Sequence, residues 1–131
     1  MKVIPFVTQH DAAQPFGFLI DSGDSRLLFA TDTYYLRYRF PGLTHILVEC
    51  NYSHAILEEN VNAGKVPAML RKRVMRSHFE LGNVKKFLLA NSMSSVEEIH
   101  LIHISGQNGD PELFRGEIQG ATGKPVFYHK K

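Results

Sequence analysis

The spacing of apolar residues changes once along the chain, near residue 33, and this change narrows the possible folds more than any other feature. Before that point, short apolar runs of strand length occur at 3–7, 16–20 and 26–30. The segment 21–25, Asp-Ser-Gly-Asp-Ser, is rich in turn-forming residues and predicts a hairpin between the last two runs. The chain is therefore expected to open with antiparallel strands.

After residue 33, strand-like and helix-like segments alternate. Apolar strands are predicted at 45–50, 99–104 and 126–128. Apolar residues three or four positions apart indicate helices: Leu57 with Val61, Leu70 with Val74, Val84 with Phe87 and Leu88, and Phe114 with Ile118. Strands that alternate with helices are typical of an α/β (α+β) fold. We therefore expect a mixed sheet with antiparallel N-terminal strands.

Length and composition exclude several classes of protein. The chain has 131 residues without a repeat or a Pro/Gly/Ser-rich linker, so we expect one domain over residues 1–131. A single cysteine excludes an internal disulfide framework and a Cys-cluster zinc site. The net charge of +2 is too small to indicate that the whole surface binds nucleic acid. Without a secretory pattern or a long apolar run, the sequence predicts no membrane span and a cytoplasmic location.

Three side chains that can bind metals occur at predicted strand ends. His10 follows the first strand, Asp32 follows the run 26–30, and His103 lies within 99–104. Two imidazoles and a carboxylate suit zinc, manganese or iron, and ligands gather beyond the carboxyl ends of strands in α/β folds. The apolar run before Asp32 would bury a carboxylate that needs a cation or donors. The alternative for each histidine is a structural hydrogen bond.

A second pair is formed by Glu49, at the end of the run 45–50, and His78. A carboxylate that accepts a hydrogen bond from an imidazole fixes its tautomer and raises its basicity, which suits a general acid. The alternative is a core glutamate beside a histidine that caps a helix. Spacing alone does not show that the two side chains meet.

The segment 65–76 is strongly basic and has no acidic residue. If Leu70 and Val74 face inward, its cations spread over the outer face of a helix, as binding of nucleic acid or another polyphosphate requires. The alternative is a solvated helix surface. The candidate phosphate-binding residues are Lys65, Arg71, Lys72, Arg73 and Arg76.

Five short motifs occur in an order that is characteristic of one superfamily. They are FVTQHDA (6–12) with PFGF (15–18), LFATDT (28–33), ILVECN (46–51), Ser77-His78, and LIHIS (101–105) with Asn108. Together they resemble the C-terminal half of the metallo-β-lactamase superfamily, in the tRNase Z-like nuclease and phosphodiesterase branch with its small bacterial and phage relatives. The resemblance covers nearly the whole chain.

This resemblance implies a role for each candidate residue. His10 matches a ligand of a first metal, Asp32 the aspartate that bridges two metals, and His103 a ligand of the second metal. Glu49 and His78 match the acid–histidine pair that helps to protonate the leaving group. The implied cofactor is Zn²⁺ or Mn²⁺, and the implied reaction is attack of a metal-bound hydroxide on phosphorus.

The chain also departs from this superfamily. The hallmark His-x-His-x-Asp-His run, which supplies four of seven metal ligands, is absent from these residues. The family fold is an αββα sandwich, so half of it, with helices on one face of its sheet, would expose a broad apolar face. Three explanations are open for a chain that contains only this half of the fold. It is an excised fragment, it lacks a partner chain that covers the apolar face, or it forms a homodimer that stacks sheet on sheet.

Two functions therefore remain open from the sequence. The first is a metal-dependent hydrolase, a phosphodiesterase or nuclease, that is incomplete without the missing ligands. The second is a non-catalytic, truncated module that self-associates and binds nucleic acid through its basic helix. For the isolated chain, metal content and mass in solution distinguish these hypotheses best.

Overall fold

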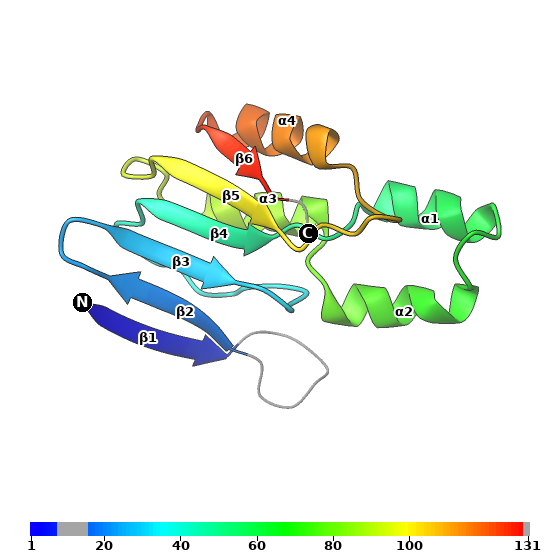
Figure 1. Ribbon diagram of the computed structural model, residues 1–131, viewed down its shortest axis with the longest axis horizontal. Coiled ribbons are helices and arrows are strands. Elements are labelled where there is room, and N and C mark those ends of the chain that lie inside the picture. The colour runs from blue at the N-terminus through cyan, green and yellow to red at the C-terminus, as the bar shows by residue number, and fades with distance from the viewer. Residues whose placement is uncertain (8–15, 130–131) are drawn as a thin grey trace.

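The computed structural model describes residues 1–7 and 16–129, and in these ranges it has six strands and four helices (Figure 1). The elements in chain order are β1 (Lys2–Val7), β2 (Phe16–Asp21), β3 (Arg26–Ala30), β4 (His45–Glu49), α1 (His54–Asn62), α2 (Ala68–Ser77), α3 (Leu81–Ala90), β5 (Glu98–Ile102), α4 (Pro111–Thr122) and β6 (Val126–Tyr128). This order confirms the predicted α/β alternation.

All these strands lie in one mixed sheet, in the order β1-β2-β3-β4-β5-β6. The first three strands pair antiparallel, and β3 to β6 pair parallel. The predicted hairpin joins β2 to β3, where the backbone N–H of Ser22 donates to the Ser25 carbonyl at 3.0 Å. Gly23 has φ 89°, a left-handed conformation that a residue without Cβ adopts at little cost.

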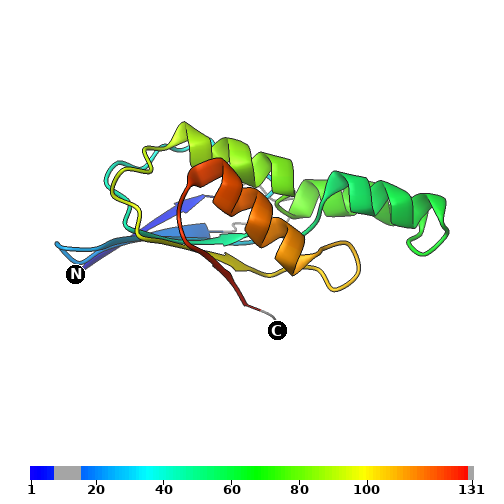
Figure 2. The ribbon, with the colours of Figure 1, turned by 90° about the horizontal axis from the view of Figure 1, so that it is seen from above.

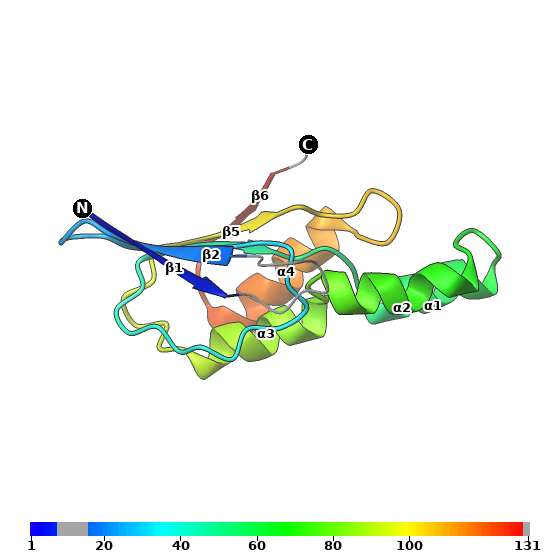
Figure 3. The same ribbon diagram turned by 90° about the horizontal axis from the view of Figure 1, so that it is seen from below.

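One face of the sheet carries the core. Alternation along the strands places Leu28, Ile46 and Ile99 side by side, and all three are fully buried. Helices α3 and α4 cover this face (Figures 2 and 3). They contribute the buried rings of Phe87 and Phe114, so the amphipathic pattern of each helix supplies the apolar stripe that the sheet face needs.

The helix ends follow capping rules. Asp110 caps α4 by accepting from the Leu113 N–H, with Pro111 at the first helical position, and Gly123 ends the helix at φ 71°. Glu80 caps α3 through its carboxylate, which accepts from the N–H groups of Gly82 and Asn83. In the part of the chain that the structure describes, no helix is both long and apolar enough to cross a bilayer.

Helices α1 and α2 form an arm, residues 54–77, that projects beyond the carboxyl ends of the strands (Figures 1 and 3). The arm has a small core of its own, built from Tyr52, Leu57 and Val66 with Val74 against it. The expected inward orientation of Leu70 is wrong, because this side chain is 38% exposed. Among the described elements, α2 packs mainly against α1, which leaves this position partly open.

The opposite face of the sheet, called the open face below, has no described helix over it (Figure 2). Cross-strand neighbours place Phe18, Phe29, Leu47, His100 and Phe127 in one row across this face. Phe18 and Phe127 are exposed large apolar side chains, and the three residues between them are half-buried. The described chain thus presents a partly apolar sheet surface, which the sequence predicted.

Cys50, which follows β4, is fully buried. Burial raises the pKa of its thiol, and the nearby Glu80 and Glu49 carboxylates raise it further, so the reactive thiolate does not form. We expect the native chain to resist an aromatic disulfide reagent at pH 8 and to react with one equivalent in 6 M guanidinium. Rapid labelling of the native chain would contradict this burial.

Candidate metal centre

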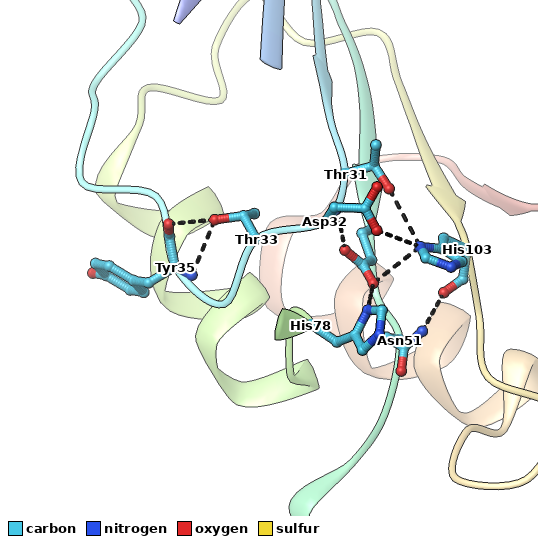
Figure 4. A network of polar contacts seen from close by, with 8 residues as sticks. Thr31, Asp32, Thr33, Tyr35, Asn51, His78 and His103 are labelled. Carbon is cyan, nitrogen blue, oxygen red and sulfur yellow. Dashed lines mark hydrogen bonds and ion pairs between the residues drawn. The ribbon is translucent and has the colours of Figure 1, made fainter. Parts of the chain in front are cut away.

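Three strand ends and one helix end meet at the carboxyl edge of the sheet (Figure 4). Asp32 follows β3 by two residues, Glu49 is the last residue of β4, and His103 comes directly after β5. Because β3, β4 and β5 are parallel, their carboxyl ends share this edge. His78 arrives from the arm, as the residue that ends α2.

Two of these residues have an uncommon backbone conformation. Asp32 has φ 53° and His103 has φ 54°. Side-chain-bearing residues adopt this left-handed region rarely and at an energetic cost, and such residues cluster at functional sites. The predicted strand over 99–104 is too long, since β5 ends at Ile102 and the chain turns at His103. The turn places this histidine at the sheet edge instead of within the strand.

Glu49 is the centre of the cluster, and its side chain is fully buried. One carboxylate oxygen, Oε1, accepts the backbone N–H of Asp32 at 2.6 Å. The other, Oε2, lies 2.6 Å from His78 Nδ1 and 3.2 Å from His103 Nδ1. A buried carboxylate needs such donors to offset its desolvation. Glu49 therefore orients both imidazoles, whereas the sequence analysis paired it with His78 only.

The hydrogen bonds decide the charge of Glu49. Burial alone raises the pKa of this carboxyl group, but the hydrogen bonds and positive character of His103 and His78 offset it, and the pKa lies below its usual value. Glu49 is thus a carboxylate at neutral pH. A carboxylate only accepts hydrogen bonds, so each histidine donates from Nδ1, which in the neutral ring puts the lone pair on Nε2.

His103 is held from several sides. Its Nδ1 lies 3.3 Å from Thr31 Oγ1 and 3.6 Å from Asp32 Oδ1. Its backbone carbonyl accepts from the Asn51 side-chain amide at 2.8 Å, and the Asn51 carbonyl in turn accepts the Ser105 N–H at 2.9 Å. These bonds fix the strained turn. The rings of His78 and His103 meet edge to face, with centroids 5.2 Å apart.

These side chains fit a metal ion. Each of Asp32, Glu49, His78 and His103 offers one ligand atom, and these atoms all lie within 4.8 Å of one another. Imidazole nitrogen and carboxylate oxygen are donors that zinc and manganese accept. A histidine that donates its second N–H to a carboxylate has the arrangement of oriented metal ligands.

A cavity of about 300 Å³ borders the cluster. Both histidines line it, together with polar groups of the segment after β5 and one apolar residue of the arm. The lining residues are Asn51, Val74, His78, His103, Ile104, Ser105, Gly106 and Asn108. A small polar substrate that fills this cavity would contact both imidazoles.

The structure brings four of the five candidate metal and catalytic residues together. His10 lies in the segment 8–15, outside the described residues. The basic residues lie in the arm: Lys65 precedes α2, and the other four lie along α2. Lys72, Arg73 and Arg76 are exposed, as is Lys65, whereas Arg71 forms an ion pair with Glu58 of α1.

Thr31 and Asn51 support the cluster and were not among the candidates from the sequence. Asn51 lies two residues after Glu49 and belongs to the ILVECN motif. This position beside a candidate residue is the sequence feature that could have identified it. Its role could not be inferred from the sequence, because its side-chain amide donates to the carbonyl of His103, 52 positions away.

Comparisons with known proteins show the fold alone. No family model matches the sequence, and no curated protein matches it. Among solved structures, the metallo-beta-lactamase fold protein YhfI from Bacillus subtilis is similar, with a TM-score of 0.68 and 14% sequence identity. The match covers 98% of this chain and 45% of that chain, so this chain spans less than half of YhfI. The predicted metallo-β-lactamase-like fold class is thereby confirmed.

Proposed function

We propose that this chain contributes to a metal-dependent hydrolytic centre that cleaves phosphodiesters, of the tRNase Z-like kind. The observation that carries the proposal is the convergence of Asp32, Glu49, His78 and His103 on one point at the sheet edge. The adjoining polar cavity adds support, because it can take the small phosphoryl group at which the reaction occurs. The basic arm adds support, because it can bind the anionic backbone of a nucleic-acid substrate.

In this proposal, Asp32 and His103 hold the metal, which is Zn²⁺ or Mn²⁺. When bound, such an ion activates water and stabilises the charge that develops on phosphoryl oxygens. Glu49 keeps both imidazoles oriented. His78, which lines the cavity, is the general acid when its ring also carries a proton on Nε2. That proton passes to the leaving oxygen, and the Nδ1 proton stays in the hydrogen bond to Glu49.

The described donor set is not sufficient for two metal ions. Three protein ligands is the usual minimum for one catalytic zinc ion. We therefore propose that the chain corresponds to the C-terminal half of the superfamily fold and that further ligands come from another chain. A second copy, which brings a second set of the same cluster residues, is the partner that we favour, because the partly apolar open face can meet itself in a symmetric dimer. Light scattering that gives a monomeric mass would contradict this dimer.

The activity is tested with bis(p-nitrophenyl) phosphate. We expect the purified chain to release p-nitrophenol with added Mn²⁺ or Zn²⁺ and to lose this activity with a chelator. The matched control is Asp32→Ala, which removes one metal donor at the sheet edge. Equal rates for the two proteins, or no rate above buffer for either at dimer-forming concentrations, would contradict the proposal.

A second candidate function rests on the arm. Four cations of α2 lie on a helix that projects from the sheet, and three of them are exposed. A non-catalytic module that binds nucleic acid would use this surface alone. The double variant Lys72→Glu/Arg73→Glu is expected to weaken binding to a single-stranded RNA about tenfold or more and to flatten its salt dependence.

The control for the arm is Lys85→Glu/Lys86→Glu, which makes the same charge change on α3. Fluorescence anisotropy at 50 to 200 mM salt measures both variants. If the two double variants lose affinity equally, net charge and not the arm determines binding. If binding is lost and metal-dependent hydrolysis of the small ester is kept, the arm recognises substrate for the hydrolase.

A further inference from the structure

The loop that joins β5 to α4 carries a motif residue that has no role in the proposed mechanism. This residue is Asn108, which follows the LIHIS motif and is only 7% exposed. It lines the cavity together with His78 and His103. Buried polar side chains are hydrogen-bonded with few exceptions, and each exception calls for an explanation. The hydrogen-bond partners of Asn108 therefore bear on its role.

Three of the four polar groups of Asn108 are bonded within the protein. Its backbone N–H donates to Ser105 Oγ at 3.0 Å, and its backbone carbonyl accepts the Ser53 N–H at 3.2 Å. Its side-chain oxygen Oδ1 accepts from Asn60 Nδ2 at 2.9 Å. The fourth group, the side-chain NH₂, has no acceptor among the described residues. One donor is thus left over in a residue that is otherwise fully bonded.

The direction of this NH₂ group follows from the neighbouring hydrogen bonds. Asn60 Nδ2 also donates to the backbone carbonyl of Gln107, at 2.9 Å. A carbonyl only accepts, so Asn60 must turn its NH₂ group, and not its oxygen, toward the loop. The second hydrogen of that group needs an acceptor as well, and this acceptor is the side-chain oxygen of Asn108. The Asn108 NH₂ group therefore points away from Asn60.

The Asn108 NH₂ group is open to the cavity. Arg26 Nε is the one side-chain polar atom in the described ranges that is enclosed without a partner, so the Asn108 nitrogen is accessible. Because Asn108 is largely buried and lines the cavity, its accessible group faces the cavity. We propose that this NH₂ group donates a hydrogen bond to a phosphoryl oxygen of the substrate and that Asn60 positions it. The role rests on the proposed function, because that function brings a phosphodiester into the cavity.

The loop holds this donor in place before a substrate binds. Ser105 Oγ also accepts the Gln107 N–H at 3.2 Å, and the Gln107 side-chain amide donates to the Lys65 carbonyl of the arm at 3.1 Å. On the other side, a Cβ on Gly109 would lie 2.7 Å from the Ser105 carbonyl oxygen and 2.9 Å from that of Asn51, so only glycine lets the loop pack this closely. A donor that is already ordered loses less affinity to entropy when it binds.

Three amide-to-carboxylate variants separate the donor from its support. Asn108→Asp keeps an oxygen that accepts from Asn60 but replaces the donor by a charge that repels a phosphate anion. We expect it to raise the Kd of the zinc-loaded chain for dimethyl phosphate about tenfold or more. Asn60→Asp removes both hydrogen bonds that hold the loop and is expected to raise this Kd about three- to tenfold. The control is Gln119→Glu, on the exposed surface of α4, which is expected to leave the Kd unchanged.

Nuclear magnetic resonance of the full chain tests the hydrogen bond directly. Dimethyl phosphate is a diester without a good leaving group, so binding is observed without turnover. The ¹H–¹⁵N signals of the Asn108 NH₂ group are identified through the backbone assignment of the loop, and Asn108→Asp lacks them. We expect these signals to move downfield and to saturate as dimethyl phosphate is added to the zinc-loaded chain. The Gln119 NH₂ signals are expected to stay in place.

Two results would overturn the role of Asn108. One is the absence of a saturable shift in its NH₂ signals, and the other is an equal Kd for Asn108→Asp and the unaltered chain. The hydrolase is tested separately, with bis(p-nitrophenyl) phosphate. A saturable shift in a chain that does not hydrolyse this ester contradicts the hydrolase and supports the donor. Hydrolysis with the same KM in Asn108→Asp as in the unaltered chain supports the hydrolase and contradicts the donor.

Discussion

Glu49→Gln lowers the free energy of unfolding of the metal-free chain by about 2–4 kcal/mol. The reason is that this buried carboxylate accepts three N–H groups, from the Asp32 backbone and from the rings of His78 and His103. The glutamine amide has only one acceptor oxygen. Its NH₂ group would face N–H donors and could not accept their hydrogen bonds. Breaking a buried, charge-assisted network by changing one member costs this much, because the remaining groups stay buried without partners.

Urea denaturation in the presence of a chelator measures this loss. The matched control is Glu58→Gln, which removes a carboxylate from the half-exposed ion pair with Arg71. Surface pairs of this kind contribute about 0–1 kcal/mol. If Glu49→Gln and Glu58→Gln unfold at the same urea concentration, Glu49 does not hold the cluster together.

His78→Ala is expected to lower metal-dependent phosphodiester hydrolysis by about 10²–10⁴-fold, the usual contribution of a general acid. Its Nδ1 is fixed by Glu49 at 2.6 Å, and its ring lines the cavity beside His103. A residue in this position protonates the leaving oxygen, so its contribution depends on how much that oxygen needs a proton.

Two substrates separate this role from a structural one. The p-nitrophenolate group leaves without help, whereas the sugar hydroxyl of a dinucleotide does not. We expect His78→Ala to lose far more activity on a dinucleotide than on bis(p-nitrophenyl) phosphate, with its metal content unchanged. Equal losses on both substrates would contradict the general-acid role and indicate that His78 acts on the metal site.

Most of the fold could be predicted because its signals are local. The apolar runs and the Asp-Ser-Gly-Asp-Ser turn placed the strands and the hairpin to within a few residues, and Asp110-Pro111 marked the start of α4. Orientation of α2 was not predictable in the same way. Leu70 has the spacing of a core residue, but the described residues around the arm leave it exposed.

The sequence predicted which residue types lie at the strand ends of the candidate site. It did not predict how their side chains are oriented. Asp32, Glu49 and His103 follow parallel strands, so their shared edge could be inferred from order alone. The left-handed turns at Asp32 and His103 depend on long-range bonds, such as those from Glu49 and Asn51, that no local pattern encodes.

Equilibrium dialysis against Zn²⁺ and Mn²⁺, followed by elemental analysis, tests the central claim that the cluster at the sheet edge binds metal. The unaltered chain is predicted to retain at least one ion per chain that the double variant Asp32→Ala/His103→Ala does not retain. Glu58→Gln, altered in the arm, is predicted to retain as much metal as the unaltered chain. Equal metal content in the unaltered chain and the double variant, with both folded, would contradict the account.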